Sequence, residues 1–208
     1  MNILIADDHA IVRKGLVQLL REEFPNAQVT EVTNGAEVYE QAREKKWDVI
    51  LLDISMPGRN GVEILKQLQA DGIKVPVLML SMHSEDQYAV RVLKAGASGF
   101  LNKETATDEL VKAVHRILSG RKYITPSVAE KLAEDVGGTL GKPLHEQLSD
   151  REMQVLQLIG KGRTVSEIAD EIALSVNTIS TYRSRILEKL HLSNSAELTR
   201  YAIENNLV

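Results

Sequence analysis

Four short apolar segments of this chain each end at polar or charged residues, and this repeated pattern restricts the fold. The segments and the residues that follow them are 3–6 before Asp7 and Asp8, 49–52 before Asp53, 75–80 before Ser81, and 99–101 before Asn102 and Lys103. Runs this short and this apolar are typical of parallel strands that helices cover on both faces. Because the carboxyl ends of such strands meet at one edge of the sheet, the sequence predicts a cluster of charged side chains there.

The first 118 residues alternate such apolar runs with amphipathic stretches, which is the pattern of repeated strand–helix units. We expect strands near 2–6, 28–32, 48–52, 76–80 and 98–101. We expect helices near 9–23, 35–45, 61–70, 85–95 and 106–118. Five such units predict an α/β domain with a five-stranded, parallel, doubly wound sheet at residues 1–118.

The pattern changes after residue 118. A short helix is expected near 125–135, and three glycines and a proline within 137–143 favour a flexible segment, so we interpret 119–147 as a linker. Residues 148–208 show helical periodicity throughout, with capping-box patterns beginning at Ser149 and Thr164. A short helix, a tight turn and a longer helix within this stretch predict a small all-α, four-helix domain with a helix-turn-helix.

Composition narrows the setting of the protein. The chain has 208 residues, 43% of them hydrophobic, and it has no cysteine, which excludes disulfides, a thiolate nucleophile and a zinc–thiolate site. No apolar run approaches the ~20 residues that a membrane helix needs, and the start of the sequence does not resemble a secretory signal. We therefore expect a soluble, cytoplasmic protein with no membrane partner.

The predicted cluster of charge suits phosphoryl chemistry. Asp53 stands alone at the end of its strand and is the best candidate for a carboxylate nucleophile. Asp7 and Asp8 suit Mg²⁺, a hard cation that prefers oxygen ligands. Lys103 can pair with a phosphoryl oxygen, and Ser81 can donate a hydroxyl hydrogen bond to another.

These residues lie in segments that resemble the receiver domain of bacterial response regulators. The matching segments are Ile5-Ala6-Asp7-Asp8-His9, Leu52-Asp53-Ile54-Ser55-Met56-Pro57, Leu80-Ser81 and Gly99-Phe100-Leu101-Asn102-Lys103. The resemblance implies a flavodoxin/CheY-like fold in which a sensor histidine kinase phosphorylates Asp53. It also implies Mg²⁺ bound by Asp7, Asp8, Asp53 and the backbone carbonyl of Ser55, and a switch involving Ser81, Lys103 and Phe100. The only catalysis implied is the domain's own phosphotransfer and dephosphorylation.

The predicted helix 176–190 has two distinct faces. Ile179, Ile186 and Leu190 form an apolar stripe, and short polar side chains occupy the opposite side, with cationic residues beside them. Short polar groups can contact base edges, while cations reach phosphates. The candidate DNA-binding residues are Asn177, Thr178, Ser180, Thr181, Tyr182, Arg183, Ser184, Arg185 and Lys189.

This part of the chain resembles the LuxR-type helix-turn-helix of the NarL/FixJ regulators. The matching segments are Leu148-Ser149-x-Arg151-Glu152-x-x-Val155-Leu156, Glu167-Ile168-Ala169, Asn177-Thr178-Ile179-Ser180-Thr181-Tyr182 and Ile186-Leu187-Glu188-Lys189-Leu190. In the helix 176–190 the sequence is most similar to the BvgA/EvgA-like branch. The resemblance implies binding to double-stranded promoter DNA as a homodimer, with Leu198, Tyr201 and Ala202 at the dimer surface. RNA polymerase is a further partner that it allows.

The charge of residues 148–208 and the residue at position 55 bear on the alternative functions. Residues 148–208 contain seven Lys and Arg against eight Asp and Glu, which would also suit a four-helix protein-binding module. A small aspartyl-phosphate enzyme would need a second acid two residues after the nucleophile, and that position is Ser55. A receiver that no longer takes phosphate would not need the full acid set. The sequence therefore favours a two-component response regulator, a transcription factor controlled by phosphorylation, in which two copies compensate for weak binding by one.

Overall fold

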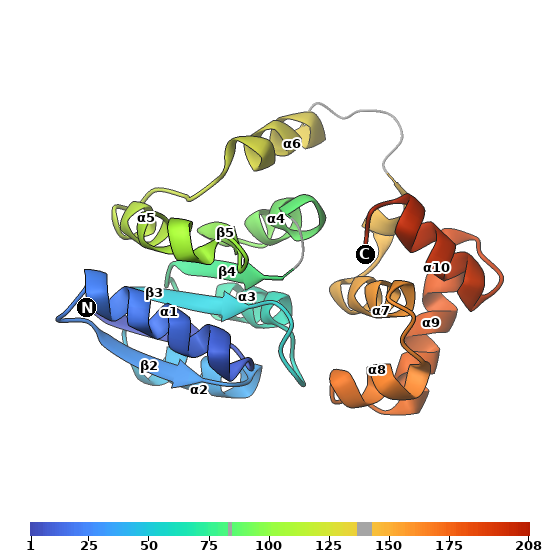
Figure 1. Cartoon of the computed structure of the whole chain (residues 1–208), viewed down its shortest axis with the longest axis horizontal. Coiled ribbons are helices and arrows are strands. Elements are labelled where there is room, and N and C mark those ends of the chain that lie inside the picture. Colours follow the sequence, from blue (N-terminus) through green and yellow to red (C-terminus); the bar gives the residue numbers. More distant parts are fainter. Residues whose placement is uncertain (83–84, 137–142) are drawn as a thin grey trace. The chain divides into compact units, whose positions relative to one another are not determined.

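The structure, a computed structural model, describes residues 1–82, 85–136 and 143–208. The chain divides into two compact units, Met1–Gly137 and Gly138–Val208. The elements of the first unit (Figure 1) are β1 (Asn2–Ala6), α1 (Ala10–Glu23), β2 (Gln28–Val32), α2 (Gly35–Glu44), β3 (Val49–Asp53), α3 (Gly61–Ala70), β4 (Val77–Ser81), α4 (Glu85–Lys94), β5 (Gly99–Asn102), α5 (Ala106–Leu118) and α6 (Pro126–Val136). The elements of the second unit are the 3-10 helix η1 (Leu144–Gln147), α7 (Asp150–Gly160), α8 (Val165–Glu171), α9 (Val176–Leu190) and α10 (Ser195–Glu204).

The described strands form one parallel sheet in the order β2-β1-β3-β4-β5, which confirms the predicted fold class. Every residue of β3 and β4 is buried, because helices cover both faces of the sheet. β1 lies between β2 and β3, so the direction in which the chain adds strands reverses beside β1. The carboxyl ends of β1 and β3 are neighbours at this point, where open α/β sheets place their functional sites.

The two faces of the sheet are covered by different helices. Ile3, Ile5 and Leu51 face α1 and α5, and they share a core with Leu20 and Leu110. The residues between them on each strand point to the opposite face, where α2 and α3 pack against each other (Figure 1). This alternation fixes which face of the sheet each strand residue packs on, and the strand ends present polar side chains at the edge.

Both described ends of the predicted linker 119–147 pack onto the units. The Tyr123 amide donates a hydrogen bond to the Ser98 carbonyl at 2.8 Å, and Tyr123 pairs with Gly99 at the start of β5. The expected short helix near 125–135 coincides with α6, which contacts α4, and Val128 on α6 is buried. At the other end η1 contacts α9. The glycine-rich residues 137–142, predicted to be flexible, lie outside the described residues.

The second unit contains the four predicted α-helices, which surround a core of fully buried side chains. These core residues are Val155, Leu156, Ile168, Ile179, Ile186, Leu198 and Ala202. The Ser149 and Thr164 hydroxyls accept hydrogen bonds from the Glu152 and Glu167 amides, and both glutamates return a bond, so both predicted capping boxes form. α8, a tight turn and α9 make the helix-turn-helix. The element η1 was not predicted, because four residues after a proline are too few to show a period.

Across the described ranges, no helix combines the length and apolar character needed to cross a lipid bilayer.

Candidate functional site

Three buried charged side chains meet at the carboxyl edge of the sheet. Asp7 follows β1, Asp53 ends β3, and Lys103 follows β5. The Lys103 Nζ atom lies 2.8 Å from Asp7 Oδ2 and 2.7 Å from Asp53 Oδ2, and the three side chains are 2%, 0% and 1% exposed, respectively. The ammonium therefore compensates two carboxylates in a site from which water is largely excluded. The spacing of the strand ends predicted that these side chains would meet at one edge of the sheet.

The loop after Asp53 is held in place by its own backbone and by the start of α3. The Ser55 amide donates a hydrogen bond to Asp53 Oδ1 at 3.2 Å. Asn60 is buried and caps α3 in a capping box with Glu63. A Cβ atom on Gly61 would lie 2.1 Å from the Asp53 carbonyl oxygen, so only glycine fits at this position.

Asn60 and Gly61 were not among the predicted site residues. The capping box Asn60-x-x-Glu63 is visible in the sequence and could have indicated the helix start. The need for glycine depends on how closely α3 approaches β3, and no local sequence signal reports that approach.

The electrostatics of Asp53 differ from those of a surface carboxylate. Burial raises the pKa of Asp53 to about 6, the charge of Lys103 opposes that increase, and the charge of Asp7 adds to it. Neutralising two buried carboxylates with a single ammonium leaves negative charge in a poorly solvated site. A further cation beside Asp53 would favour the ionised form of this carboxylate.

The donor set fits a hard divalent cation. Ligand atoms of Asp7, Asp8, His9 and Asp53 all lie within 4.8 Å of one another. Three of these four residues offer a carboxylate oxygen, the type of ligand that Mg²⁺ and Ca²⁺ prefer. The His9 backbone amide donates to Asp7 Oδ1 at 2.8 Å, and its Nδ1 lies 2.8 Å from Asp8 Oδ1, so this histidine also orients the acids at the start of α1.

The remaining predicted receiver residues lie on β4 and β5. Ser81 ends β4, is fully buried, and accepts a hydrogen bond at its carbonyl from the Lys103 amide at 2.8 Å. Phe100 is also buried, and it lies opposite Met79 in the strand register. The structure therefore brings Ser81 to the same sheet edge as Asp53, and it holds Phe100 in the interior behind that edge.

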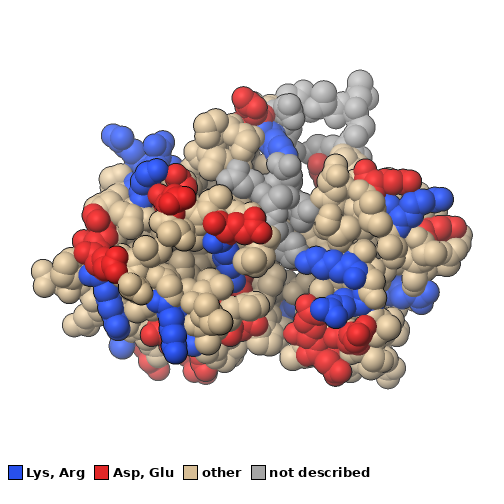
Figure 2. All heavy atoms as spheres, in the orientation of Figure 1, with Lys and Arg blue, Asp and Glu red and all other residues tan. Residues whose placement is uncertain are grey.

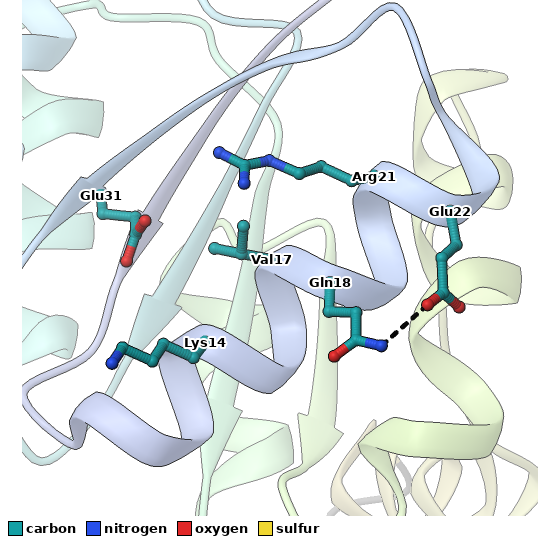
Figure 3. Close-up of a pocket in the computed structure, with 6 residues that line it drawn as sticks. All are labelled: Lys14, Val17, Gln18, Arg21, Glu22 and Glu31. Atoms are coloured by element: carbon teal, nitrogen blue, oxygen red, sulfur yellow. Dashed lines mark hydrogen bonds between the residues drawn. The ribbon is translucent and has the colours of Figure 1, made fainter.

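A separate surface depression of about 500 Å³ lies along α1, away from the carboxylate cluster (Figure 3). Its lining residues are Lys14, Val17, Gln18, Arg21, Glu22 and Glu31. Figure 3 shows the Lys14 and Arg21 side chains extending on either side of Val17, and Gln18 bonded to Glu22 at 2.9 Å. The depression is open and of mixed charge, and none of the predicted site residues lines it. The chemistry at Asp53 gives the stronger evidence of function.

The second candidate site is the outer face of α9. Asn177, Ser180, Thr181 and Ser184 are exposed there, while Ile179 and the rest of the apolar stripe are buried in the unit. Thr178 and Tyr182 are half-buried beside this face. The helix therefore presents short hydroxyl and amide side chains outward, as the sequence predicted.

Two of the three cationic side chains expected beside this face make contacts within the unit. The Arg183 Nε atom donates to Ser195 Oγ at 2.7 Å, which ties α9 to the start of α10. Lys189 Nζ lies 2.6 Å from Glu152 Oε2. Burial acts to raise the pKa of Glu152, but hydrogen bonds from Lys189 and Ser149 outweigh it and hold that pKa below its usual range. Arg185 is exposed.

Two of the three residues predicted for dimerisation are core residues. Leu198 and Ala202 are 0% exposed, because α10 packs against α7. A Cβ atom on Gly160 of α7 would lie 2.7 Å from the Ala202 Cβ, which shows how close the two helices are. Tyr201 is half-buried, and its hydroxyl lies 3.1 Å from His145 Nδ1. The prediction placed Leu198 and Ala202 on an outer surface because the apolar periodicity of α10 does not reveal which partner covers it.

Basic and acidic side chains lie close to one another on the face of the second unit drawn in Figure 2. Figure 2 shows lysine and arginine side chains interspersed with acidic ones on the face drawn, and the described residues there form no continuous basic surface.

A buried acid–lysine cluster at the edge of a parallel sheet, combined with a helix-turn-helix, defines a class of protein in which a signal-receiving domain controls a DNA-binding domain.

Comparisons with known proteins agree with this class. Residues 3–115 match the response regulator receiver domain, and residues 146–202 match the bacterial regulatory proteins of the luxR family. The chain belongs to the two-component response regulators that regulate transcription through a LuxR-type DNA-binding domain.

Relatives match along the whole chain. It is 34% identical over 208 residues to the response regulator UvrY of Escherichia coli (strain K12), covering 100% of this chain and 95% of that protein. It is 34% identical over 209 residues to the response regulator GacA of Pseudomonas viridiflava, with 100% and 98% covered. A structure of RcsB from Salmonella enterica serovar Typhimurium, bound to promoter rprA with the phosphomimetic BeF3-, is 27% identical, with a TM-score of 0.65 over 97% of this chain and 98% of that one.

Proposed function

We propose that a sensor histidine kinase phosphorylates Asp53, and that this phosphorylation controls homodimerisation and binding of promoter DNA by α9. The observation that supports it most directly is the buried Asp53 carboxylate with Lys103 Nζ at 2.7 Å. A carboxylate in this position is poised to accept a group whose negative charge the ammonium can then pair with. The domain's own phosphotransfer and dephosphorylation are the only catalysis in this proposal.

The receiver residues have distinct roles in this step. An oxygen of Asp53 attacks the phosphorus of a phosphohistidine, the new P–O bond forms as the P–N bond breaks, and the imidazole nitrogen keeps the electron pair. Lys103 then pairs with a phosphoryl oxygen, and the Ser81 hydroxyl donates a hydrogen bond to another. Phe100 packs behind Ser81 and shifts with it, which carries the change along β4 and β5.

Asp7, Asp8 and Asp53, with the Ser55 backbone carbonyl, would hold Mg²⁺. The fit rests on the convergent carboxylate oxygens and on the negative charge that Lys103 leaves uncompensated. When bound there, Mg²⁺ supplies positive charge for the phosphoryl oxygens. The burial of Asp7 and Asp53 limits competition from water for the same oxygens.

DNA binding is proposed for the outer face of α9 and its flanks. Asn177, Ser180, Thr181 and Ser184 face outward to reach base edges, and Thr178, Tyr182 and Arg185 lie at the margins of that face. Arg183 and Lys189 are engaged within the unit, so in this proposal they position α9 and reach phosphates only if those contacts are exchanged.

Homodimerisation is proposed to use the exposed side of α10, where Tyr201 is half-exposed and Ile203 is 58% exposed. Two copies would double the number of phosphate contacts made by a unit of low charge. We further propose a cytoplasmic location and contact with RNA polymerase, as the regulatory role requires access to DNA. The resemblance of α9 to the BvgA/EvgA-like branch stays a prediction, since the relatives named above include UvrY and GacA and do not test it.

The phosphoacceptor is tested by incubating the purified full chain with acetyl phosphate and Mg²⁺ and measuring its intact mass. We expect one phosphoryl group on the wild type and on D108N, a matched change at an exposed carboxylate on α5, and none on D53N. Phosphorylation of D53N to the wild-type level would refute the assignment of Asp53.

A further inference from the structure

The exposed face of α9 contains hydroxyl groups whose hydrogens are already engaged. Thr181 Oγ1 donates to the Asn177 carbonyl at 2.9 Å, and Ser184 Oγ donates to the Ser180 carbonyl at 3.0 Å. A hydroxyl has one hydrogen and two acceptor lone pairs. Toward solvent, Thr181 and Ser184 therefore present only hydrogen-bond acceptors.

Long cationic donors are absent from the first part of this face. Between Val176 and Tyr182 the sequence contains neither lysine nor arginine. Further along α9, Arg183 and Lys189 are hydrogen-bonded to Ser195 and Glu152 within the unit, and the exposed Arg185 lies at the margin of the face. Guanine presents acceptors, N7 and O6, along its major-groove edge, so reading it requires donors. The centre of the α9 face lacks the groups best suited to that edge.

We propose that Thr181 and Ser184 accept hydrogen bonds from the exocyclic amino groups of adenine N6 and cytosine N4. The target half-site then carries an amino base, A or C, rather than a keto base, G or T, at the positions that these two side chains contact. At the major-groove edge, the exocyclic amino group of A or C donates a hydrogen bond, whereas the keto oxygen of G or T accepts one. This inference rests on the proposed function, in which α9 enters the major groove.

The preference follows from what each alternative costs. To donate to a keto oxygen, Thr181 or Ser184 must rotate its hydroxyl and give up its bond to the helix carbonyl. The loss of one such neutral hydrogen bond corresponds to about two- to tenfold in affinity. Accepting a hydrogen bond from an amino group keeps the hydrogen bond within α9 and adds a second one. The hydrogen bonds already present in the free protein therefore favour amino bases over keto bases.

The test is selection from a randomised duplex library by the acetyl phosphate-treated full chain, followed by fluorescence anisotropy on the selected site and on single amino-to-keto exchanges. The variants are T181V, which keeps the shape of threonine, S184A, S184K and the control S193A, an exposed serine beyond α9. Binding to unrelated DNA checks that T181V, S184A and S193A stay folded; S184K adds one positive charge, so only its base preference is compared.

We expect the wild type and S193A to favour A or C at the contacted positions. T181V and S184A should each lose about two- to tenfold of discrimination at one position, and S184K should shift that position to G or T. The inference is overturned if T181V and S184A select the same bases as strongly as the wild type. It is also overturned if the positions they affect hold G or T in the wild-type site. Failure of the wild type to select any sequence would overturn the proposed function, and this inference with it.

Discussion

At Asp53 the chain places a carboxylate among buried side chains, with the Lys103 ammonium as its counter-charge. A surface aspartate has a pKa of about 3.9, whereas burial raises that of Asp53 to about 6, against the opposing effect of Lys103. The ionised Asp53 carboxylate is therefore destabilised in this site. A bound metal ion, or a phosphoryl group together with its cations, can compensate for that cost. This links the chemistry at Asp53 to the stability of the first unit.

The first prediction concerns this cost. Because the folded pKa of Asp53 exceeds the unfolded value, the ionised carboxylate lowers the free energy of unfolding progressively as pH rises from about 4 to about 6. Without divalent cations, D53N should be more stable than the wild type at pH 7, by on the order of 1–3 kcal/mol, and the gap should close near pH 4. Trp47, the only tryptophan of the chain and a residue of the first unit, reports urea unfolding by fluorescence.

Mg²⁺ serves as the internal control for that measurement. It should stabilise the wild type and the surface variant D108N more than D53N, since the variant lacks one of the proposed ligands. If D53N is the less stable protein at pH 7 in chelator, burial does not destabilise the ionised carboxylate, and the electrostatic account of the site is wrong.

A second prediction concerns the ion pair between Lys189 and Glu152. The pKa of Glu152 is lowered, because bonds from Lys189 and Ser149 outweigh its burial, so its stabilisation is present above about pH 4.5 and is lost as pH falls through the folded pKa. K189M should lower the stability of the second unit by about 1–2 kcal/mol at pH 7, and by little near pH 3. Amide hydrogen exchange in α7 and α9 measures this, with R185M as the control on the same helix. Equal protection of K189M and the wild type at pH 7 would contradict it.

At the level of elements, the start of α3 controls the position of the loop after Asp53, the proposed phosphoacceptor. The Gly61 amide donates to the Ile54 carbonyl at 3.0 Å, and the absence of a side chain lets α3 approach the Asp53 carbonyl. Asn60 fixes the helix start through its capping box. The position of Asp53 thus depends on a helix–strand contact as well as on its own strand.

A third prediction follows from this contact. G61A forces a Cβ atom against the Asp53 carbonyl oxygen, so it should destabilise the first unit by about 1–3 kcal/mol and slow phosphorylation by acetyl phosphate. G15A is the matched control, because a Cβ there meets nothing within 4 Å and alanine favours the helix by about 0.5–1 kcal/mol. Trp47 fluorescence and intact mass measure both effects. Wild-type stability and phosphorylation in G61A would show that the contact is unimportant.

The same elements show what the sequence could predict. Apolar runs indicated the buried strands β3 and β4, and helical periods indicated the described α-helices, because burial leaves a direct pattern in the residues. The mostly exposed β2 was expected from the alternation of strand and helix stretches. Strand ends indicated which polar side chains would meet, since parallel strands share an edge. The fit of Gly61, the partner of Lys189 and the burial of Leu198 depend on contacts between distant segments, which no local pattern encodes. The burial of Leu198 and Ala202 in the unit could not be predicted for that reason, and their part in dimerisation stays a prediction.

For the whole molecule, the second unit carries no net positive charge, so the affinity for DNA depends on how many copies of the chain bind. Residues 148–208 hold seven basic against eight acidic residues, and the described basic side chains on the face drawn in Figure 2 are interspersed with acids. A single copy can therefore neutralise few phosphates. In the proposed function a second copy on the same DNA supplies further phosphate contacts, so the affinity for DNA would be controlled by dimerisation.

A fourth prediction tests that dependence. The slope of log affinity against log salt concentration reports the number of phosphates neutralised. Phosphorylation should about double this slope if it converts one bound copy into two. Anisotropy titrations of a selected DNA fragment at several salt concentrations measure it, with D53N as the unphosphorylated reference. A slope that phosphorylation leaves unchanged would mean that the same number of copies binds in both states.

The most direct test of the central claim is an anisotropy titration of that DNA fragment with the wild type, D53N and D108N, each with and without acetyl phosphate and Mg²⁺. The account predicts that the phosphodonor tightens binding by the wild type and D108N, and that it leaves D53N at the level of the untreated protein. Equal tightening of D53N by the phosphodonor would contradict it, because DNA binding would then be controlled without phosphorylation of Asp53.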